Sequence, residues 1–290
     1  MAGGRSTERV FTSRATIEGA GVRLRRAFGY AEVPLFDPFL MLDDFRADRP
    51  EDYLAGFPWH PHRGIETVTY MLEGKVEHGD SMGHAGIVGA GCVQWMTAGS
   101  GILHQEMPKP DAGSDGRMGG FQLWVNLPRK NKMMDPRYQE ITADRIPEIS
   151  PAGGVQVKVI AGTVDGTTGP VREIVAEPEF LDISLDPERE WTHRLPAGHS
   201  LVCYVIGGRG YFGAGGRELG NHDAAIFTTG DSVLFRSGSQ GVRFLLFSGK
   251  PIREPVAWRG PIVMNTDEEL RLAFREYRDG TFIKKAGITG

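Results

Sequence analysis

Four residues in two short segments have the types and the spacing of a metal-binding site. His60 and His62 form one pair, and His104 and Glu106 form another, with a single residue between the members of each pair. Side chains two positions apart on an extended strand point to the same face. If the two strands lie opposite each other, the four side chains converge on one point.

This set of side chains predicts the kind of ion. Three imidazoles and one carboxylate suit a divalent transition metal such as iron, manganese, nickel, copper or zinc, whereas magnesium and calcium prefer oxygen ligands. A set without thiolates is not the closed, Cys-rich type that staples a fold, so water or a substrate has room to complete the coordination sphere. We expect function at that open position.

Glu66 is a second carboxylate close to the first pair of histidines. It shares one face of a predicted strand with Val68 and Tyr70, and we expect this apolar face to point inward. Glu66 is therefore an alternative to Glu106 as the fourth ligand. It could equally contact the ligands or belong to a structural salt bridge.

The other five histidines are not assigned to the metal site. His78 and His84 lie among turn residues, and we expect both to be exposed to solvent. His193, His199 and His222 are not paired with a residue of the ligand type two positions away, so structural or surface roles are expected for them.

The segments around these residues are typical of short β-strands. Apolar runs such as residues 10–17, 21–28 and 39–45 are closed by Gly, Pro or Asp. The 290 residues include 40 glycines and 18 prolines, which are spread between apolar runs as turns. One helix is predicted near the end, where Thr266 and Glu269 form a capping box ahead of an apolar stripe. The sequence therefore predicts an all-β fold with a C-terminal α-helix.

The second half of the chain repeats the first in outline. Residues 204–208 align with 70–74, and residues 237–241 align with the turn at 98–101. The residues that replace the four candidate ligands in this register are Arg194, Pro196, Phe244 and Leu246. We therefore expect a duplicated fold that binds one metal ion per chain, in the first half.

The repeat and the proline-rich polar stretch between the halves predict the domain boundaries. We expect a metal-binding domain over residues 1–136 and an interdomain connection over 137–154. A second domain without the metal site is expected over 155–265, followed by the helix and a tail over 266–290.

The candidate ligands lie in motifs that resemble the pirin family of the cupin superfamily. Residues 58–70, PWHPHRGIETVTY, hold the first pair, and residues 101–106, GILHQE, hold the second. Further matching segments are residues 36–45, 120–128 and 260–266. The resemblance therefore spans nearly the whole chain.

The resemblance implies two tandem cupin barrels of the jelly-roll type, with one metal ion, usually Fe2+, in the first. In pirins the ligands are an H-x-H pair and an H-x-E pair, which fall here on His60, His62, His104 and Glu106. The general cupin pattern instead has a glutamate shortly after H-x-H, at the position of Glu66. We follow the pirin pattern and expect Glu106 to be the ligand.

The resemblance also implies an activity, that of a quercetin 2,3-dioxygenase, which cleaves a flavonol with O2. In that reaction Glu106, or Glu66 if it is not a ligand, is the candidate base for the flavonol 3-hydroxyl. Phe57, Trp59 and Trp95 are candidates for an aromatic pocket. The alternative implied by the resemblance is a non-catalytic, redox-responsive module that binds a protein partner, either as a transcription co-regulator or as a regulator of a metabolic enzyme.

Composition argues against several other classes. A net charge of −4 gives no basic surface for a nucleic-acid backbone, so direct nucleic-acid binding is not expected. The apolar runs are far too short to span a membrane. Cys92 and Cys203 do not form a disulfide framework, and the N-terminal residues do not read as a signal peptide. We therefore expect a cytoplasmic protein, or a nuclear one in a eukaryote.

Overall fold

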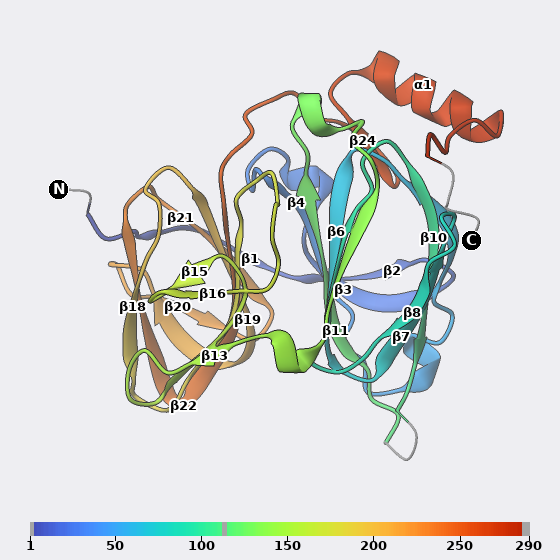
Figure 1. Cartoon of the computed structure of the whole chain (residues 1–290). Coiled ribbons are helices and arrows are strands. Elements are labelled where there is room, and N and C mark those ends of the chain that lie inside the picture. The colour runs from blue at the N-terminus through green and yellow to red at the C-terminus, as the bar shows by residue number, and fades with distance from the viewer. Residues whose placement is uncertain (1–2, 112–114, 286–290) are drawn as a thin grey trace. The chain divides into compact units, whose positions relative to one another are not determined.

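The computed structural model of the chain describes residues 3–111 and 115–285. Strands dominate the described residues, and the one α-helix is near the C-terminus, so the predicted fold class is confirmed (Figure 1). The chain forms two compact units. Of the described residues, the first unit contains 14–34, 39–111, 115–143 and 252–285, and the second contains 3–13, 35–38 and 144–251.

The first unit is built from two antiparallel sheets. The seven-stranded sheet has the order β12 (Arg137–Ile141), β9 (Val93–Thr97), β6 (Ile65–Glu73), β11 (Gly119–Asn126), β4 (Phe39–Asp44), β3 (Val22–Phe28) and β2 (Arg14–Glu18). The four-stranded sheet has the order β5 (Phe57–His62), β10 (Ile102–Lys109), β7 (Lys75–Asp80) and β8 (Ala85–Val88). Buried side chains from both sheets form one core cluster, in which Met71 of β6 joins Val76 of β7 and Val88 of β8. The two sheets therefore pack face to face, and their inner faces enclose the site.

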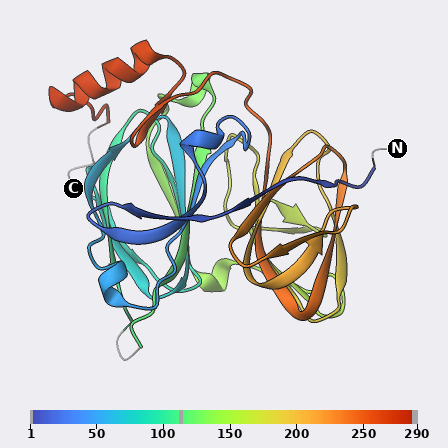
Figure 2. The ribbon, with the colours of Figure 1, turned by 180° about the vertical axis from the view of Figure 1, so that it is seen from behind.

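The C-terminal segment completes the first unit. It forms the hairpin β23 (Ala257–Arg259) and β24 (Ile262–Met264) and then α1 (Asp267–Arg278), which lies outside the two sheets in both ribbon views (Figure 2). The predicted capping box is confirmed, because Glu269 N donates to Thr266 Oγ1 at 3.2 Å and Thr266 N donates to the Glu269 carboxylate at 3.0 Å. Ile262, Leu270 and Ala273 form a buried cluster that holds the helix to the hairpin.

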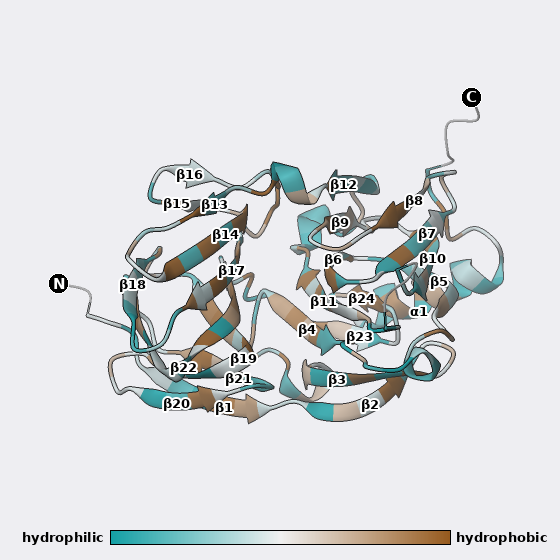
Figure 3. Cartoon of the chain, turned by 90° about the horizontal axis from the view of Figure 1, so that it is seen from below, coloured by the Kyte–Doolittle hydropathy of each residue, from teal (hydrophilic) through white to brown (hydrophobic). Residues whose placement is uncertain are grey.

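The second unit is organised around one large sheet. Its central path is β1 (Thr7–Thr12), β21 (Asp223–Phe227), β19 (Ser200–Phe212), β22 (Ser232–Gly249), β17 (Glu179–Leu185), β14 (Val155–Ala161) and β13 (Glu148–Ile149). The remaining strands are β18 (Glu190–Arg194), which pairs with β22, β20 (Arg217–Gly220), which pairs with β19, and the hairpin of β15 (Thr163–Val164) and β16 (Thr167–Thr168). Hydrophobic and hydrophilic bands alternate along β14 (Figure 3), and its buried valines join Phe244 and Leu246 in an apolar core.

The short 3-10 helices are η1 (Tyr30–Glu32), η2 (Pro50–Asp52), η3 (Arg129–Asn131) and η4 (Ala143–Arg145). None of the helices in the described part of the chain is both long and apolar enough to cross a membrane.

The two units do not follow the order of the chain, unlike the predicted domains. The predicted first domain includes strand β1. In the structure β1 pairs with β21 of the second unit, and its Val10 packs on the apolar core of that unit. Residue alternation identifies a strand without identifying its pairing partner, so the sequence did not reveal this exchange. The C-terminal helix belongs to the first unit, and the chain enters the second unit at Asp144, within the predicted connection. Tail residues 286–290 lie outside the described residues.

Gly64 is a position where the fold of the first unit requires glycine. Its φ is +78°, and a Cβ there would lie 1.9 Å from the carbonyl oxygen of Val263 in the C-terminal hairpin. Gly83 has a similar φ of +88° but has no atom within 4 Å of an added Cβ. The left-handed conformation costs a residue with a side chain about 1–2 kcal/mol, and displacing packed neighbours adds about 1–3 kcal/mol.

We therefore expect Gly64→Ala to lower the thermal unfolding midpoint of the first unit by several degrees more than Gly83→Ala does. A difference of 1 kcal/mol corresponds to about 2–4 °C in a unit of this size. Differential scanning calorimetry of both variants measures this difference. Equal midpoints for the two variants would show that the hairpin moves away without cost.

Candidate metal centre

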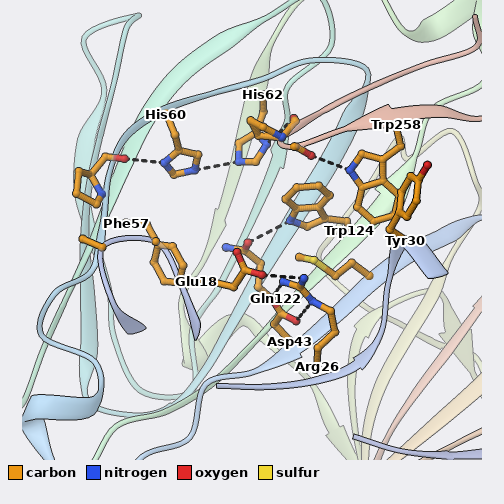
Figure 4. Close-up of a pocket in the computed structure, with 16 residues that line it drawn as sticks. Glu18, Arg26, Tyr30, Asp43, Phe57, His60, His62, Gln122, Trp124 and Trp258 are labelled. Atoms are coloured by element: carbon orange, nitrogen blue, oxygen red, sulfur yellow. Dashed lines mark hydrogen bonds and ion pairs between the residues drawn. The ribbon is translucent and has the colours of Figure 1, made fainter. Parts of the chain in front are cut away.

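The two histidine-bearing strands lie side by side, as the spacing predicted. Strands β5 and β10 are antiparallel, with His60 directly opposite His104 and His62 opposite Ile102. One ligand nitrogen from each of His60, His62 and His104 lies within 4.8 Å of the others. Figure 4 shows His60 and His62 pointing toward each other at one side of a cavity. Sequence spacing therefore identified three side chains that converge.

Backbone carbonyls fix the proton positions on two of these imidazoles. His60 Nδ1 lies 2.8 Å from the carbonyl oxygen of Pro58, and His62 Nδ1 lies 3.1 Å from that of Pro261. A carbonyl only accepts hydrogen bonds, so each Nδ1 carries a proton and donates it. Each Nε2 is then left with a lone pair, and the two Nε2 atoms face each other at 3.1 Å. A cation bound by both lone pairs would remove their repulsion.

The burial of His104 also indicates a site for a cation. Its side chain is 1% exposed, and neither ring nitrogen has a hydrogen-bond partner within the described ranges. Burial, together with the neighbouring imidazoles, holds the pKa values of His62 and His104 well below 6.5, so both rings are neutral at pH 7. Neutral imidazole is the form that binds a metal. The nitrogens of this site therefore fit a divalent transition metal.

Glu106 is oriented by a chain of hydrogen bonds. Thr69 Oγ1 donates to Glu106 Oε1 at 3.1 Å, and Gln122 Nε2 donates to Oε2 at 2.9 Å. Trp124 Nε1 in turn donates to Gln122 Oε1 at 3.1 Å. Glu106 is 5% exposed and shares the face of β10 that carries His104, but it lies outside the group of three converging nitrogens. Its role as the fourth ligand stays a prediction.

Glu66 lies on the opposite face of β6 from the residues that reach the site. It is paired with Thr97, whose Oγ1 donates to Glu66 Oε1 at 2.6 Å, whereas Thr69 on the other face donates to Glu106. The expectation that Glu66 points inward was wrong because both faces of β6 are buried, so apolar alternation does not distinguish them. Burial raises the pKa of Glu66 to about 7. The structure gives Glu66 no direct access to the histidines.

His78 was expected to be exposed but is buried. It lies on β7 directly opposite Glu106, and its Nε2 is 3.0 Å from a carboxylate oxygen of Glu140. The glycines around it indicated turns, but β7 is a regular strand covered on both edges by β10 and β8. His84 is exposed as expected and pairs with Asp80.

A row of polar side chains crosses the inner face of the seven-stranded sheet at the level of Glu106. Its members are direct neighbours in strand register, and they are Arg26, Asp43, Gln122, Thr69, Gln94 and Glu140. Sequence reasoning missed this row. The signal was present as single polar residues inside apolar strands, such as Gln122 in GGFQLWVN, because a polar group buried in a core needs a partner.

The histidines open onto a cavity with aromatic walls. Its volume is about 560 Å³, within the usual range for small-molecule sites, and Phe57, Tyr30, Trp124 and Trp258 line it. The Trp124 ring packs against His62 at 5.1 Å and against Trp258 at 5.6 Å between centroids (Figure 4).

Of the three aromatic residues proposed for the cavity wall, only Phe57 lies there. The Trp59 side chain is 53% exposed, and Trp95 is opposite Val68 on the face of the sheet that carries Glu66. Trp124 and Trp258 take their place. Trp258 comes from the distant C-terminal hairpin, which local spacing around the ligands does not predict.

Two buried basic side chains fix the backbone that follows His62. Arg63 donates to the carbonyl oxygens of Ser100 and Phe282, both at 2.7 Å. Lys132 Nζ donates to the carbonyl oxygens of Gly64 at 2.9 Å and Val263 at 3.1 Å, and to Asn126 Oδ1 at 2.7 Å. These contacts join the loop between β5 and β6 to the C-terminal segment, which also supplies the carbonyl that orients His62.

Two facing antiparallel sheets with three converging histidines are the arrangement of a cupin domain with a candidate metal site. Residues 21–125 match the family model described as Pirin, and residues 180–283 match the model described as Pirin C-terminal cupin domain. Relatives with the name pirin or pirin-like protein are similar to the chain along most of their length. The chain belongs to the pirin family, which confirms the resemblance.

Three relatives show how far this similarity extends. A Pseudomonas aeruginosa protein that carries the provisional name quercetin 2,3-dioxygenase is 45% identical over 93% of this chain and 95% of its own length. Human Pirin is 42% identical over 92% of this chain and 90% of its own length. The crystal structure of a quercetin 2,3-dioxygenase from Acinetobacter baumannii superposes with a TM-score of 0.87, at 31% identity over 96% of this chain and 98% of that one.

A structure at lower identity shares the fold. The Escherichia coli pirin YhhW, crystallised with nickel(II), superposes with a TM-score of 0.63 at 24% identity, over 84% of this chain and 99% of that one. The family and the three histidines together indicate a metal-binding site in the first unit.

The positions of the two glutamates predict different effects of their removal. We expect Glu106→Gln to lower metal affinity about 10-fold or more, because its carboxylate is held beside His104 on the inner face. We expect Glu66→Gln to leave metal content unchanged, because it lies on the other face of β6. Elemental analysis of both variants, purified without chelating resin, measures the difference. Loss of the ion from Glu66→Gln alone would instead support the general cupin pattern.

Lys132 predicts a pH dependence of stability. Burial lowers its pKa from 10.5 to about 7. Between these values the unfolded chain holds a proton that the folded chain has released, so stability rises with pH by about 1.4 kcal/mol per unit. We expect this slope between pH 7.5 and 9.5 to be shallower in Lys132→Met, measured by urea unfolding at several pH values. Parallel slopes for the two proteins would contradict the lowered pKa.

Proposed function

We propose that this protein is a metal-dependent dioxygenase of the quercetin 2,3-dioxygenase type, with His60, His62, His104 and Glu106 as ligands to one Fe2+. The observation that carries the proposal is the set of three converging imidazole nitrogens beside a cavity with aromatic walls. The dioxygenase names of the similar proteins from Pseudomonas and Acinetobacter support the reaction class. The substrates are then a flavonol and O2.

The bound ion would supply a Lewis acid for the flavonol 3-hydroxyl and a redox-active centre for O2. The cavity residues then position the substrate. Trp124 and Trp258 offer apolar ring faces to a flat aromatic ligand, and the Trp124 ring already packs on His62. A flavonol stacked on these rings would have its chelating oxygens at the histidine side of the cavity.

Glu106 is the candidate for handling the proton of the 3-hydroxyl. Its two oxygens each accept one hydrogen bond, from Thr69 and Gln122, and each has a second lone pair available. A general base must lie about 2.6–3.2 Å from the proton-bearing oxygen. The hydrogen bonds keep the carboxylate aimed into the site, so Thr69 and Gln122 are positioning residues.

Oxygen uptake tests the proposal. Protein reloaded separately with Fe2+, Mn2+, Ni2+, Cu2+ or Zn2+ is mixed with quercetin in an oxygen electrode, and the products are separated by chromatography. We expect turnover with the resident metal, and at least 100-fold lower turnover in His104→Ala, because an imidazole ligand is lost. Trp258→Ala should lower kcat/KM about 10-fold, while Trp59→Ala, outside the cavity, should not change it.

A metal-loaded protein that binds the ion with one equivalent but consumes no oxygen with flavonols would overturn this proposal. The non-catalytic, redox-responsive binding module would then be the better account of the same centre.

A further inference from the structure

A guanidinium and two carboxylates form a charged cluster in the cavity wall. Arg26 Nε and Nη2 donate to the two oxygens of Asp43 at 2.8 and 2.7 Å, and Arg26 Nη1 lies 2.8 Å from Glu18 Oε1. All three residues line the cavity that the histidines open onto. Figure 4 shows this cluster across the cavity from His60 and His62. A ligand that touches both ends must therefore extend along the aromatic wall.

The cluster has unused hydrogen-bonding capacity. A guanidinium has five N–H groups, and Asp43 and Glu18 account for three of those on Arg26. Glu18 Oε1 lies beside Arg26 Nη1, and a carboxylate has about four lone-pair sites, so this group can accept further hydrogen bonds. The side chains of Arg26 and Glu18 are 30% and 39% exposed, so a ligand in the cavity can reach them.

The charges of the cluster indicate which ligand group fits. Burial raises the pKa of Asp43 to about 6, so at pH 7 most of this carboxyl is ionised and the cluster has more negative than positive charge. An anionic ligand group would be repelled. A neutral hydroxyl on an aromatic ring can donate to the Glu18 carboxylate and accept from an Arg26 N–H.

The guanidinium is also held in place before a ligand arrives. Its two bonds to Asp43 are of the paired, parallel type that fixes geometry as well as charge. On its other side, a Cβ at Gly29 would lie 2.9 Å from Arg26 Cδ, so glycine leaves the room that the arginine stem occupies. A fixed donor loses less conformational freedom on binding a ligand.

We propose that Arg26 and Glu18 form a subsite for a phenolic hydroxyl of the substrate, at the end remote from the oxygens that bind the metal. The subsite rests on the proposed function, because it takes a flavonol as the ligand. It selects among flavonols by the hydroxyl groups on their rings. Asp43 acts as a positioning residue, since both of its oxygens are occupied by Arg26.

Anaerobic binding of two flavonols to the metal-loaded protein tests the subsite. Quercetin has ring hydroxyls remote from the chelating pair, whereas 3-hydroxyflavone has the chelating oxygens alone. We expect the wild type to prefer quercetin. Glu18→Gln should weaken quercetin binding about 10-fold, the loss typical of a hydrogen bond to a charged group, and should change 3-hydroxyflavone binding less than about twofold.

Two further variants make the test specific. Arg26→Lys keeps a cation beside Asp43 but loses the paired geometry, and it should show the same selective loss for quercetin. Glu51→Gln, an exposed glutamate outside the cavity, should bind both ligands as the wild type does.

The outcomes separate the subsite from the function on which it rests. If Glu18→Gln and Arg26→Lys keep the wild-type preference, or weaken both ligands equally, the cluster is a structural ion network and the subsite is wrong, while the dioxygenase proposal stands. If the metal-loaded wild type binds neither flavonol, the dioxygenase proposal and the subsite both fail.

Discussion

The close approach of three imidazoles, one of them buried without hydrogen-bond partners in the described part of the chain, is the constraint on which the first unit depends. A buried polar atom left unpaired costs free energy, and here His104 has two such nitrogens while the Nε2 lone pairs of His60 and His62 oppose each other. The protein's own groups hold this unfavourable arrangement. Carbonyl oxygens fix His60 and His62, and the strand pairing of β5 with β10 fixes His104. A bound cation would interact with the lone pairs of these nitrogens and so remove the cost of leaving them unpaired.

Contacts from the C-terminal segment also hold the histidines of this centre in place. The carbonyl of Pro261 orients His62, although 199 residues separate them. Arg63 and Lys132 tie the loop after His62 to Phe282 and Val263. A buried cation is tolerated only when acceptors surround it, so these lysine and arginine contacts fix the loop and the C-terminal segment as one arrangement. The site is therefore a property of the folded unit and not of one motif.

The sequence predicted the parts of the protein that depend on local spacing. The paired histidines, the strands and the capped helix all follow from periodicity or from short motifs. The exchange of β1, the inner face of β6 and the burial of His78 did not follow, because each depends on which strand is the neighbour. A strand with both faces buried, such as β6, has no polar side to show its orientation. Long-range pairing thus limited the prediction.

The interiors of the two units are filled by different kinds of side chain. Strands of the second unit fill their core with apolar side chains such as Phe244 and Leu246, which need no partners. Across the inner sheet of the first unit runs the polar row that includes Gln122 and Thr69, and each member needs a hydrogen bond. Apolar side chains stabilise a core without the desolvation cost that buried polar groups carry. Thr69 and Gln122 of this row donate the hydrogen bonds that orient Glu106, a task that apolar side chains cannot perform.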